Sequence, residues 1–280
     1  MAFHHRPKLG QHFLCDSDFQ RRLVAALGLY PDDLVIEIGA GRGELTELLA
    51  EQARHVIALE VDEQLASHLK QKCGDNPRVE VCVRDILQTD LGRVCREHGH
   101  QQCFVFGNLP YYITSPILHH VFRFRSAIRS MGLLMQREVA ERVTALPGTR
   151  DYGYLRVMVQ THSQPRASLH IPPGAFRPRP QVHSTLVVFA MEPSFPLWSP
   201  AEEEQFLQFV KLCFAQKRKT ILNNLAARYS QAKVLHAFEE LGFARTCRAE
   251  QLPIDRLAQL YGELDRPNEQ RSKGNGTNRP

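Results

Sequence analysis

The stretch "LVIEIGAGRGELTELLAEQARHVIALE", residues 34–60, carries the pattern that decides the fold. An apolar run leads into a turn with glycine at every second position, then into an amphipathic segment, and then into a second apolar run that ends in Glu60. A buried strand, a glycine-rich turn and a helix in this order are typical of the first crossover unit of a parallel sheet. The stretch therefore predicts strand, loop, helix and strand.

The same alternation continues along the chain. Further runs of strand length, flanked by segments with helical periodicity, lie at 79–85, 103–108, 131–136 and 184–191. Short strands separated by helices form right-handed crossovers in a parallel sheet. We therefore predict an α/β fold, a doubly wound, Rossmann-like domain with helices on both faces of the sheet. The proline-rich segment 167–180 is predicted to be an exposed loop, because proline is excluded from central strands.

The sequence changes character after residue 192. The segment 193–200 contains three prolines and has neither a helical nor a strand period, which indicates a linker between a domain at 1–192 and a second domain. Apolar residues then recur at helical spacing, so 201–264 is predicted to be a small C-terminal all-α domain. The polar residues 265–280 include little that a core would bury, and they are predicted to form a disordered tail.

The composition excludes several classes of protein. Hydrophobic residues make up 43% of the 280 residues, and no apolar run reaches the roughly 20 residues that span a bilayer. The start of the chain lacks the apolar core of a secretory signal, and the seven cysteines include no C-x-x-C pair. We therefore expect a soluble, cytoplasmic protein with reduced thiols, without a membrane span and without a metal site.

Basic residues form two short clusters, although the formal net charge of +5 is too small to indicate nucleic-acid binding by itself. One cluster contains Arg177 and Arg179, and the other contains Lys217, Arg218 and Lys219. Guanidinium and ammonium groups in such clusters bind phosphates. A solvated surface explains each cluster equally well when it is taken singly.

The glycine-rich turn suggests a nucleoside cofactor. Glycine at 39 and 41 lets the backbone turn tightly and approach a ligand, and Glu60 ends the next strand where a carboxylate accepts hydrogen bonds from ribose hydroxyls. The spacing G-x-G-x-G differs from the G-x-G-x-x-G typical of dinucleotide binding. Glu37 beside the turn would repel phosphate and favour a cationic ligand such as S-adenosyl-L-methionine. Asp85 either accepts a hydrogen bond from the adenine amine or caps the next helix.

The segment "NLPY", residues 108–111, follows the fourth apolar run and falls at the carboxyl edge of the predicted sheet. An aromatic amine that attacks a methyl-sulfonium gains positive charge, which oxygen acceptors stabilise. The side-chain oxygen of Asn108 and the carbonyl of Leu109 or Pro110 are candidate acceptors, and Tyr111 can stack on a flipped base. The alternative is a plain turn, with Asn108 as turn former, Pro110 at a helix start and the tyrosine in the core.

Taken together, these segments resemble the ribosomal RNA adenine N6-dimethyltransferases, and among them the small-subunit, kasugamycin-sensitivity type. The resemblance extends along nearly the whole chain and includes Glu60. It is carried, in order, by "KLGQHFL" (8–14), "EIGAGRGELT" (37–46), "RDIL" (84–87), "GNLPYYIT" (107–114), "QREVAERV" (136–143), "DYGYL" (151–155), "FRPRPQVHS" (176–184) and "FAQKRKTILNNL" (214–225).

The resemblance implies a methyltransferase that dimethylates N6 of two adjacent adenosines in the 3′-terminal hairpin loop of small-subunit (16S) rRNA during ribosome biogenesis. Its partner would be that rRNA within an assembling 30S particle, held in part by the helical domain, and we expect the chain to act as a monomer. Asn108 and Tyr111 would lie at the target base. The implied contacts to S-adenosyl-L-methionine come from His12, Leu14, Gly39, Gly41, Glu60, Asp85 and Asn108.

The sequence departs from the family pattern at three positions. The family usually has Asn at the position of His12 and Asp at the position of His183. At the position of Tyr112 it commonly has Asn or a similar polar residue. A ring nitrogen of His12 can still form a hydrogen bond. Three other readings remain: a macrolide-resistance type that acts on large-subunit rRNA, a mitochondrial transcription-factor type that only binds, and a nicotinamide-dependent dehydrogenase. The dehydrogenase reading leaves the "NLPY" segment without a function.

Overall fold

The computed structural model describes residues 12–109 and 113–265. The chain divides into two compact units, one made of residues 1–144 and 162–192 and the other of residues 145–161 and 193–280. Each unit has its own arrangement of helices and strands, and the first contains the sheet.

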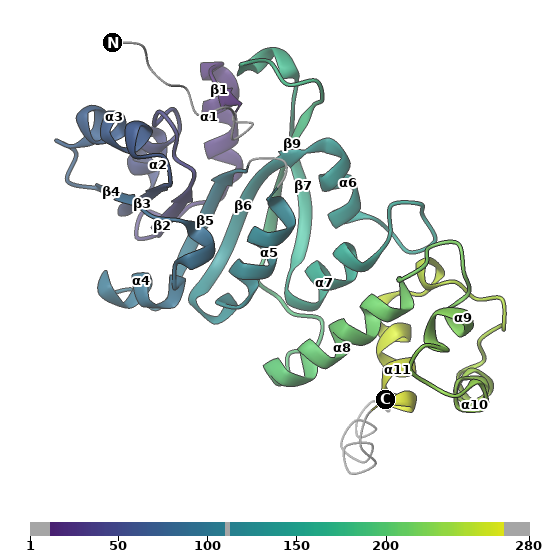
Figure 1. The fold of residues 1–280 in the computed structure, drawn as a ribbon. Coiled ribbons are helices and arrows are strands. Elements are labelled where there is room, and N and C mark those ends of the chain that lie inside the picture. The colour runs from purple at the N-terminus through teal and green to yellow at the C-terminus, as the bar shows by residue number, and fades with distance from the viewer. Residues whose placement is uncertain (1–11, 110–112, 266–280) are drawn as a thin grey trace, which may run out of the picture. The chain divides into compact units, whose positions relative to one another are not determined.

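The first unit is built on a sheet that has seven strands within the described residues. Five strands run parallel, β9 is antiparallel to β6, and β7 is antiparallel to β9 at the edge (Figure 1). Across the sheet the strands are β4 (Val79–Val83), β3 (His55–Glu60), β2 (Leu34–Ile38), β5 (Cys103–Asn108), β6 (Ile128–Gln136), β9 (Ser184–Ala190) and β7 (Gln164–Ile171). Every residue of β2 is buried, as expected for a central strand covered on both faces.

Helices follow the parallel strands in sequence. Several begin at an aspartate whose carboxylate accepts backbone N–H groups of the first turn, as Asp16 does at α1, Asp62 at α3 and Asp90 at α4. The helices of this unit are α1 (Ser17–Ala26), α2 (Thr46–Gln52), α3 (Glu63–Cys73), α4 (Leu91–Glu97), α5 (Thr114–Phe122) and α6 (Arg137–Thr144), with short 3₁₀ turns η1 (Ile86–Gln88), η2 (Arg125–Ala127) and η3 (Pro173–Ala175). The predicted doubly wound α/β domain is confirmed.

A two-stranded ribbon joins segments that are far apart in the sequence. β1 (Phe13–Leu14) pairs antiparallel with β8 (Phe176–Arg177), and the N–H of Cys15 donates to the carbonyl of Ala175 at 2.9 Å. The ribbon brings residues 12–14 beside the basic segment 176–180.

The prediction of an exposed loop at 167–180 is wrong for residues 167–171, which belong to a strand, and for the buried Phe176, which belongs to β8. Residues 164–171 form β7, which within the described residues pairs only with β9, and Pro165 is tolerated there because an edge strand leaves one side of its backbone unpaired. The two prolines at 172 and 173 follow the end of the strand, where they interrupt no pairing.

The second unit is helical, as predicted for the C-terminal part of the chain. Its core is aromatic: the ring of Phe206 lies edge-on to those of Trp198 and Tyr261, with centroids 5.2 and 5.7 Å away. The unit includes α8 (Pro200–Cys213), α9 (Ile221–Leu225), α10 (Gln231–Leu241), η4 (Ala249–Gln251), α11 (Ile254–Leu264) and most of α7 (Tyr154–His162). Within this part of the chain, Thr220 caps α9, and residues 216–219 form a turn before it.

The division between the units differs from the sequence-based boundaries in one segment. Residues 145–161 belong to the helical unit, whereas the sequence assigned all of 1–192 to the first domain. Hydrogen bonds explain the grouping: the N–H of Gly148 donates to the carbonyl of Glu250 at 2.6 Å, and the Ser194 hydroxyl donates to the carbonyl of Gln160 at 2.8 Å. The segment 193–200 is also packed rather than extended, since the rings of Phe195 and Trp198 stack 4.0 Å apart.

Candidate functional site

The predicted site residues of the first unit meet where the order of the strands reverses. The chain places β3 and then β4 on one side of β2, and it then crosses to the other side of β2 to form β5. Ile38 pairs with Gly107, so the glycine turn that follows β2 and Asn108 at the end of β5 emerge side by side. Ligands of open α/β sheets bind at such a switch point, outside the carboxyl ends of the strands.

The glycine turn adopts a conformation that side chains disfavour. Gly39, Gly41 and Gly43 have φ angles of 69°, 60° and 77°. A Cβ atom on Gly41 would lie 2.8 Å from a ring carbon of Phe13. The guanidinium of Arg42 lies over the same ring, 4.7 Å from its centroid. Glycine is therefore required both for the backbone angles and for the close approach of Phe13.

Glu60 holds this turn in place. One carboxylate oxygen accepts from the N–H of Gly41 at 2.9 Å, and the other accepts from the N–H groups of Val61 and Asp62 at 2.9 and 3.0 Å. Glu60 is 1% exposed, so these bonds lie in a shielded environment. A carboxylate offers about four lone-pair directions, so three backbone bonds leave room for one further donor.

The role expected for Glu37 is wrong. From the sequence, Glu37 was predicted to be negatively charged and to repel phosphate from the glycine turn. The side chain is instead buried, burial raises the pKa of Glu37 to about 8, and the Thr46 hydroxyl donates to its Oε2 at 2.6 Å. At neutral pH the carboxyl group is mostly protonated, and it anchors the first turn of α2 rather than selecting a charged ligand.

Asp85 performs the capping role that the sequence left open as one of two alternatives. Its Oδ1 accepts from the N–H of Leu87 at 2.9 Å at the start of η1. The residue is half-buried and lines a surface hollow of about 460 Å³ together with Arg84, Gln88 and Arg93, among others. Capping leaves Oδ2 at the surface, 3.4 Å from the side-chain amide of Gln88.

Asn108 is held in a fixed orientation. Its side-chain nitrogen donates to the backbone carbonyl of His12 at 3.0 Å, which turns the amide oxygen to the opposite side. The next residue, Leu109, is buried, and its N–H donates to the carbonyl of Leu134 at 3.1 Å. Pro110 and Tyr111, as well as Tyr112, lie outside the described residues.

His12 and Leu14 join the site to the ribbon. The Nδ1–H of His12 donates to the carbonyl of Pro178 at 2.7 Å, while the backbone of His12 holds Asn108. Leu14 is buried in the core, and its carbonyl accepts from the side chain of Gln20 at 2.6 Å. The carbonyl of His183 accepts from the N–H of Arg137 at 2.9 Å at the start of α6.

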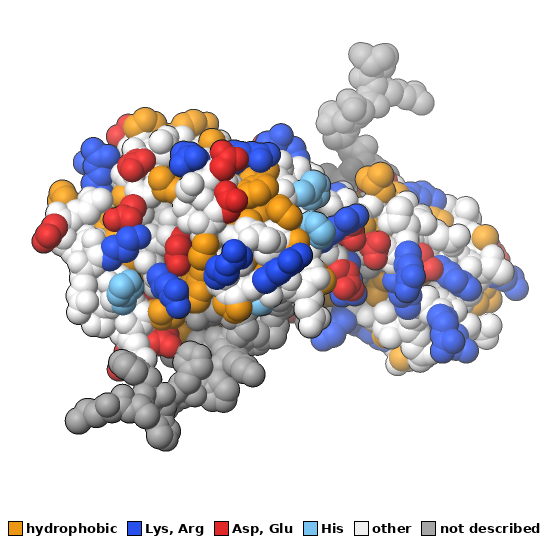
Figure 2. All heavy atoms as spheres, turned by 90° about the horizontal axis from the view of Figure 1, so that it is seen from above, with side chains coloured by type: hydrophobic (Ala, Val, Ile, Leu, Met, Phe, Trp, Pro, Cys, Tyr) orange, Lys and Arg blue, Asp and Glu red, His pale blue; other side chains and the backbone are white. Residues whose placement is uncertain are grey.

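The two basic clusters lie in different units of the chain, and all five side chains are exposed. One guanidinium nitrogen of Arg177 donates to the carbonyls of Gly174 and Phe176 at 3.0 and 2.9 Å. The amine of Lys217 donates to the carbonyl of Arg150. On the face drawn in Figure 2, Lys and Arg side chains lie among Asp and Glu, so the described part of that face carries no continuous basic surface.

Sequence reasoning missed the two residues that pack over the glycine turn, Phe13 and Arg42. Phe13 stands inside the "KLGQHFL" segment, between the two residues singled out there, and Arg42 stands between two of the glycines. Their contact depends on the pairing of β1 with β8, which no local pattern reveals. None of the described helices has the length and hydropathy of a membrane span.

The doubly wound sheet, with a glycine turn at its switch point, and the helical C-terminal unit define a two-part Rossmann-like architecture, and comparison with known proteins finds this architecture in rRNA methyltransferases. A structure of the 23S rRNA methyltransferase ErmE matches with a TM-score of 0.70 and 27% identity over 91% of this chain and 100% of that one. A dimethyladenosine transferase from Plasmodium falciparum shares the fold, with a TM-score of 0.76 and 24% identity over 94% of this chain and 98% of that one.

The family follows from the sequence comparisons. A family model described as ribosomal RNA adenine dimethylase matches residues 2–266. A relative from Acidobacterium capsulatum, named ribosomal RNA small subunit methyltransferase A, is 43% identical over 93% of this chain and 92% of its own length. A relative of the same name from Koribacter versatilis is 40% identical over 92% of this chain and 94% of its own length. The chain belongs to the ribosomal RNA adenine dimethylase family and is an rRNA adenine dimethyltransferase.

Proposed function

We propose that the protein dimethylates N6 of two adjacent adenosines in the 3′-terminal hairpin loop of 16S rRNA, with S-adenosyl-L-methionine as methyl donor. Support for the small-subunit substrate comes from the relatives at 43% and 40% identity, whose names specify small-subunit rRNA. The substrate would be rRNA in an assembling 30S particle, on which a monomeric enzyme would act in the cytoplasm.

The residues at the switch point fit the proposed cofactor. The glycine turn leaves space that a Cβ would fill, Glu60 retains one acceptor direction for a ribose hydroxyl, and the half-buried carboxylate of Asp85 suits an adenine amine. His12 and Leu14 would contribute through the ribbon that borders the turn. When bound, S-adenosyl-L-methionine supplies an electrophilic methyl group on a positively charged sulfur.

The orientation of Asn108 is the observation that carries the proposed mechanism. Its side-chain nitrogen donates to His12, and within the described residues its oxygen remains available to accept a hydrogen bond from the N6 amine of the target base. That amine loses its conjugation and gains positive charge as it forms the new bond to carbon, so an acceptor stabilises the transition state more than the ground state. The carbonyl of Leu109 or Pro110 would be the second acceptor.

Two further roles complete the proposal. Tyr111 would stack on the flipped adenine, a contact that contributes about 1–3 kcal/mol per base in other complexes. Arg177, Arg179 and the cluster Lys217, Arg218 and Lys219 would bind rRNA phosphates, for which their exposure is a precondition.

A second candidate function is methylation of large-subunit rRNA, which the similarity to the 23S rRNA methyltransferase favours. Labelled S-adenosyl-L-methionine should be offered, with the protein, to purified small and large subunits that both lack the modification. We expect label on small subunits, recovered after digestion as N6,N6-dimethyladenosine. Label on large subunits alone would establish the second candidate instead.

A further inference from the structure

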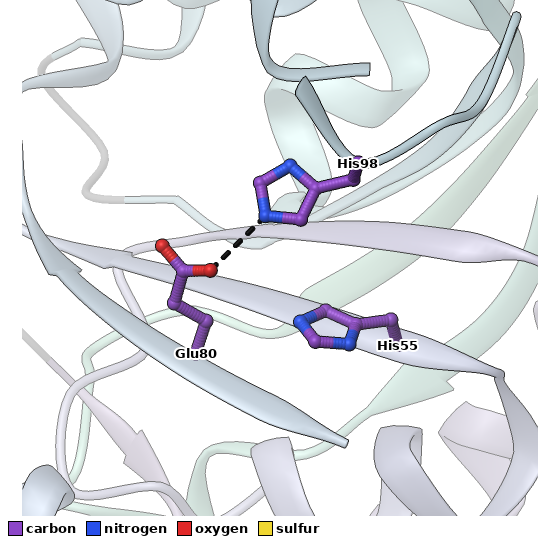
Figure 3. A group of neighbouring side chains, drawn as sticks. All are labelled: His55, Glu80 and His98. Carbon is purple, nitrogen blue, oxygen red and sulfur yellow. Dashed lines mark hydrogen bonds and ion pairs between the residues drawn. The ribbon is translucent and has the colours of Figure 1, made fainter. Parts of the chain in front are cut away.

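Two histidines and a glutamate from three elements of the first unit converge away from the candidate site (Figure 3). His55 is the first residue of β3, Glu80 lies in β4, and His98 is the C-cap of α4. Each of the three side chains offers one nitrogen or oxygen atom that can bind a metal ion, and these three atoms all lie within 4.8 Å of one another. Glu80 pairs with Ile57, two residues beyond His55, so both side chains project from the same face of the sheet.

The second ring nitrogen of His98 faces a carboxylate. Its Nδ1 lies 2.8 Å from the carbonyl of Val94, and because a carbonyl only accepts, Nδ1 carries a hydrogen. The other nitrogen, Nε2, lies 3.0 Å from Oε2 of Glu80. In the neutral ring both of these atoms are acceptors, so a cation, either a proton or a metal ion, must lie between them.

His55 contributes a buried nitrogen whose bonding capacity is unused. Nε2 of His55 is inaccessible to solvent and has no hydrogen-bond partner in the described part of the chain. Its ring centroid lies 5.6 Å from that of His98. A neutral imidazole nitrogen is a metal ligand, and a proton shared by His98 and Glu80 would leave this one unused.

We propose that His55 Nε2, the Glu80 carboxylate and His98 Nε2 bind a zinc ion, with solvent as the fourth ligand. Two imidazoles and one carboxylate are a donor set that zinc accepts, whereas magnesium and calcium favour oxygen ligands. Contacts around the ligands match those of metal centres: the Val94 carbonyl orients His98, and the Cys82 thiol donates to Oε1 of Glu80 at 3.2 Å.

The ion would be structural rather than catalytic. His55 and Glu60 stand at opposite ends of β3, about 16 Å apart at the usual rise of a strand. The zinc ion would fasten the C-terminal end of α4 to β3 and to the edge strand β4. Sequence reasoning expected no metal because it searched for C-x-x-C spacing, and these three ligands have no such local signature.

The test is a zinc titration against a competing chromophoric chelator. His4 and His5 are first replaced by Gln in all variants, because adjacent histidines bind zinc on their own. We expect one zinc ion per chain, with the affinity reduced at least about tenfold by His55→Gln, His98→Gln or Glu80→Gln. His236→Gln removes an exposed histidine from α10 and serves as the control, with unchanged affinity. Magnesium in excess should not displace the zinc.

X-ray absorption of the zinc-loaded parent chain provides a readout that does not depend on whether any variant folds. We expect a first shell of nitrogen and oxygen that includes scattering from two imidazole rings. Equal zinc affinity in the His98→Gln and His236→Gln chains, or a spectrum without imidazole, would overturn the proposal and leave a protonated His98 paired with Glu80.

Discussion

At the scale of single residues, the central feature is that one side chain of the site is held by the backbone of another segment. Under the proposed mechanism Asn108 acts as an acceptor through its amide oxygen, and the carbonyl of His12 fixes the orientation of the side chain by accepting from its amide nitrogen. This contact uses the backbone carbonyl of His12, so it does not depend on the side chain at position 12, where the sequence departs from the family pattern.

Replacing Asn108 with Ala should lower kcat about 100-fold, the usual effect of removing one group that stabilises transition-state charge. Binding of rRNA should change little, because the acceptor acts mainly in the transition state. Single-turnover methylation and filter binding measure the two effects. Asn223→Ala, an exposed asparagine in α9, is the control. A variant at 108 with normal turnover would refute the role of the amide oxygen.

The buried carboxyl of Glu37 predicts an unusual pH dependence of stability. Burial raises its pKa to about 8, above the value near 4.5 of an exposed glutamate, so the folded chain holds a proton that the unfolded chain releases between these values. Rising pH therefore destabilises the folded state across this window, by up to about 1.4 kcal/mol per pH unit, and the loss levels off above the folded pKa.

Urea unfolding at several pH values should show this effect as a difference between chains. The free energy of unfolding of the parent chain should fall relative to that of Glu37→Gln from about pH 5 to about pH 8. Glu51→Gln, which removes an exposed carboxyl from the end of α2, should follow the parent chain. Parallel profiles for the parent and Glu37→Gln would show that Glu37 is ionised in the folded state.

At the scale of elements, the turn after β2 depends on a partner from the ribbon. Gly41→Ala introduces a left-handed strain of about 1–2 kcal/mol and also forces Phe13 to move. Gly28→Ala has the same backbone requirement, with φ of 67°, but a Cβ there meets nothing within 4 Å. Both variants should lose stability, and only Gly41→Ala should also lose affinity for S-adenosyl-L-methionine, measured by calorimetry. Equal affinities of the Gly41→Ala and Gly28→Ala chains for S-adenosyl-L-methionine would show that the turn does not contact the cofactor.

The turn before α9 is the element that should govern RNA affinity in the helical unit. Arg218→Gln with Lys219→Gln should weaken rRNA binding and flatten its salt dependence, by about 0.7–0.9 in slope for each lost phosphate contact. Lys217 is left intact because its amine also supports the carbonyl of Arg150. The control is the double variant Arg21→Gln with Arg22→Gln, which removes the same charge from an exposed surface of α1. Equal slopes in the two double variants would assign residues 218 and 219 to a solvated surface.

Elements with strong local patterns could be predicted from the sequence. The strands of the parallel sheet and most of their helices follow from alternating apolar periods, because burial on both faces leaves continuous apolar runs. β7 was missed because its exposed face is polar and prolines surround it, while its pairing with β9 is decided by tertiary contact. The ribbon of β1 and β8 was missed for the same reason, since each strand has two residues and no period.

At the scale of the whole molecule, the site is assembled from strand ends, and that part of it was predictable. The rule that ligands bind at a switch point places the glycine turn, Glu60 and Asn108 at one edge of the sheet from the sequence alone. The protonation of Glu37 was not predictable, because it depends on how completely the sheet and α2 enclose the carboxyl group. The zinc ligands escaped detection because three separate elements supply them.

Dimethylation of two adjacent adenosines of small-subunit rRNA is the proposal on which the assigned roles of the site residues depend. It can be tested in cells by mass spectrometry of rRNA fragments, with and without the protein, and with nucleotide-level mapping of every methylated adenine. We expect two neighbouring N6,N6-dimethyladenosines near the 3′ end of 16S rRNA to disappear together when the protein is absent and to return when it is restored. Unchanged 16S rRNA, with a methylated adenine lost from 23S rRNA instead, would refute the proposal.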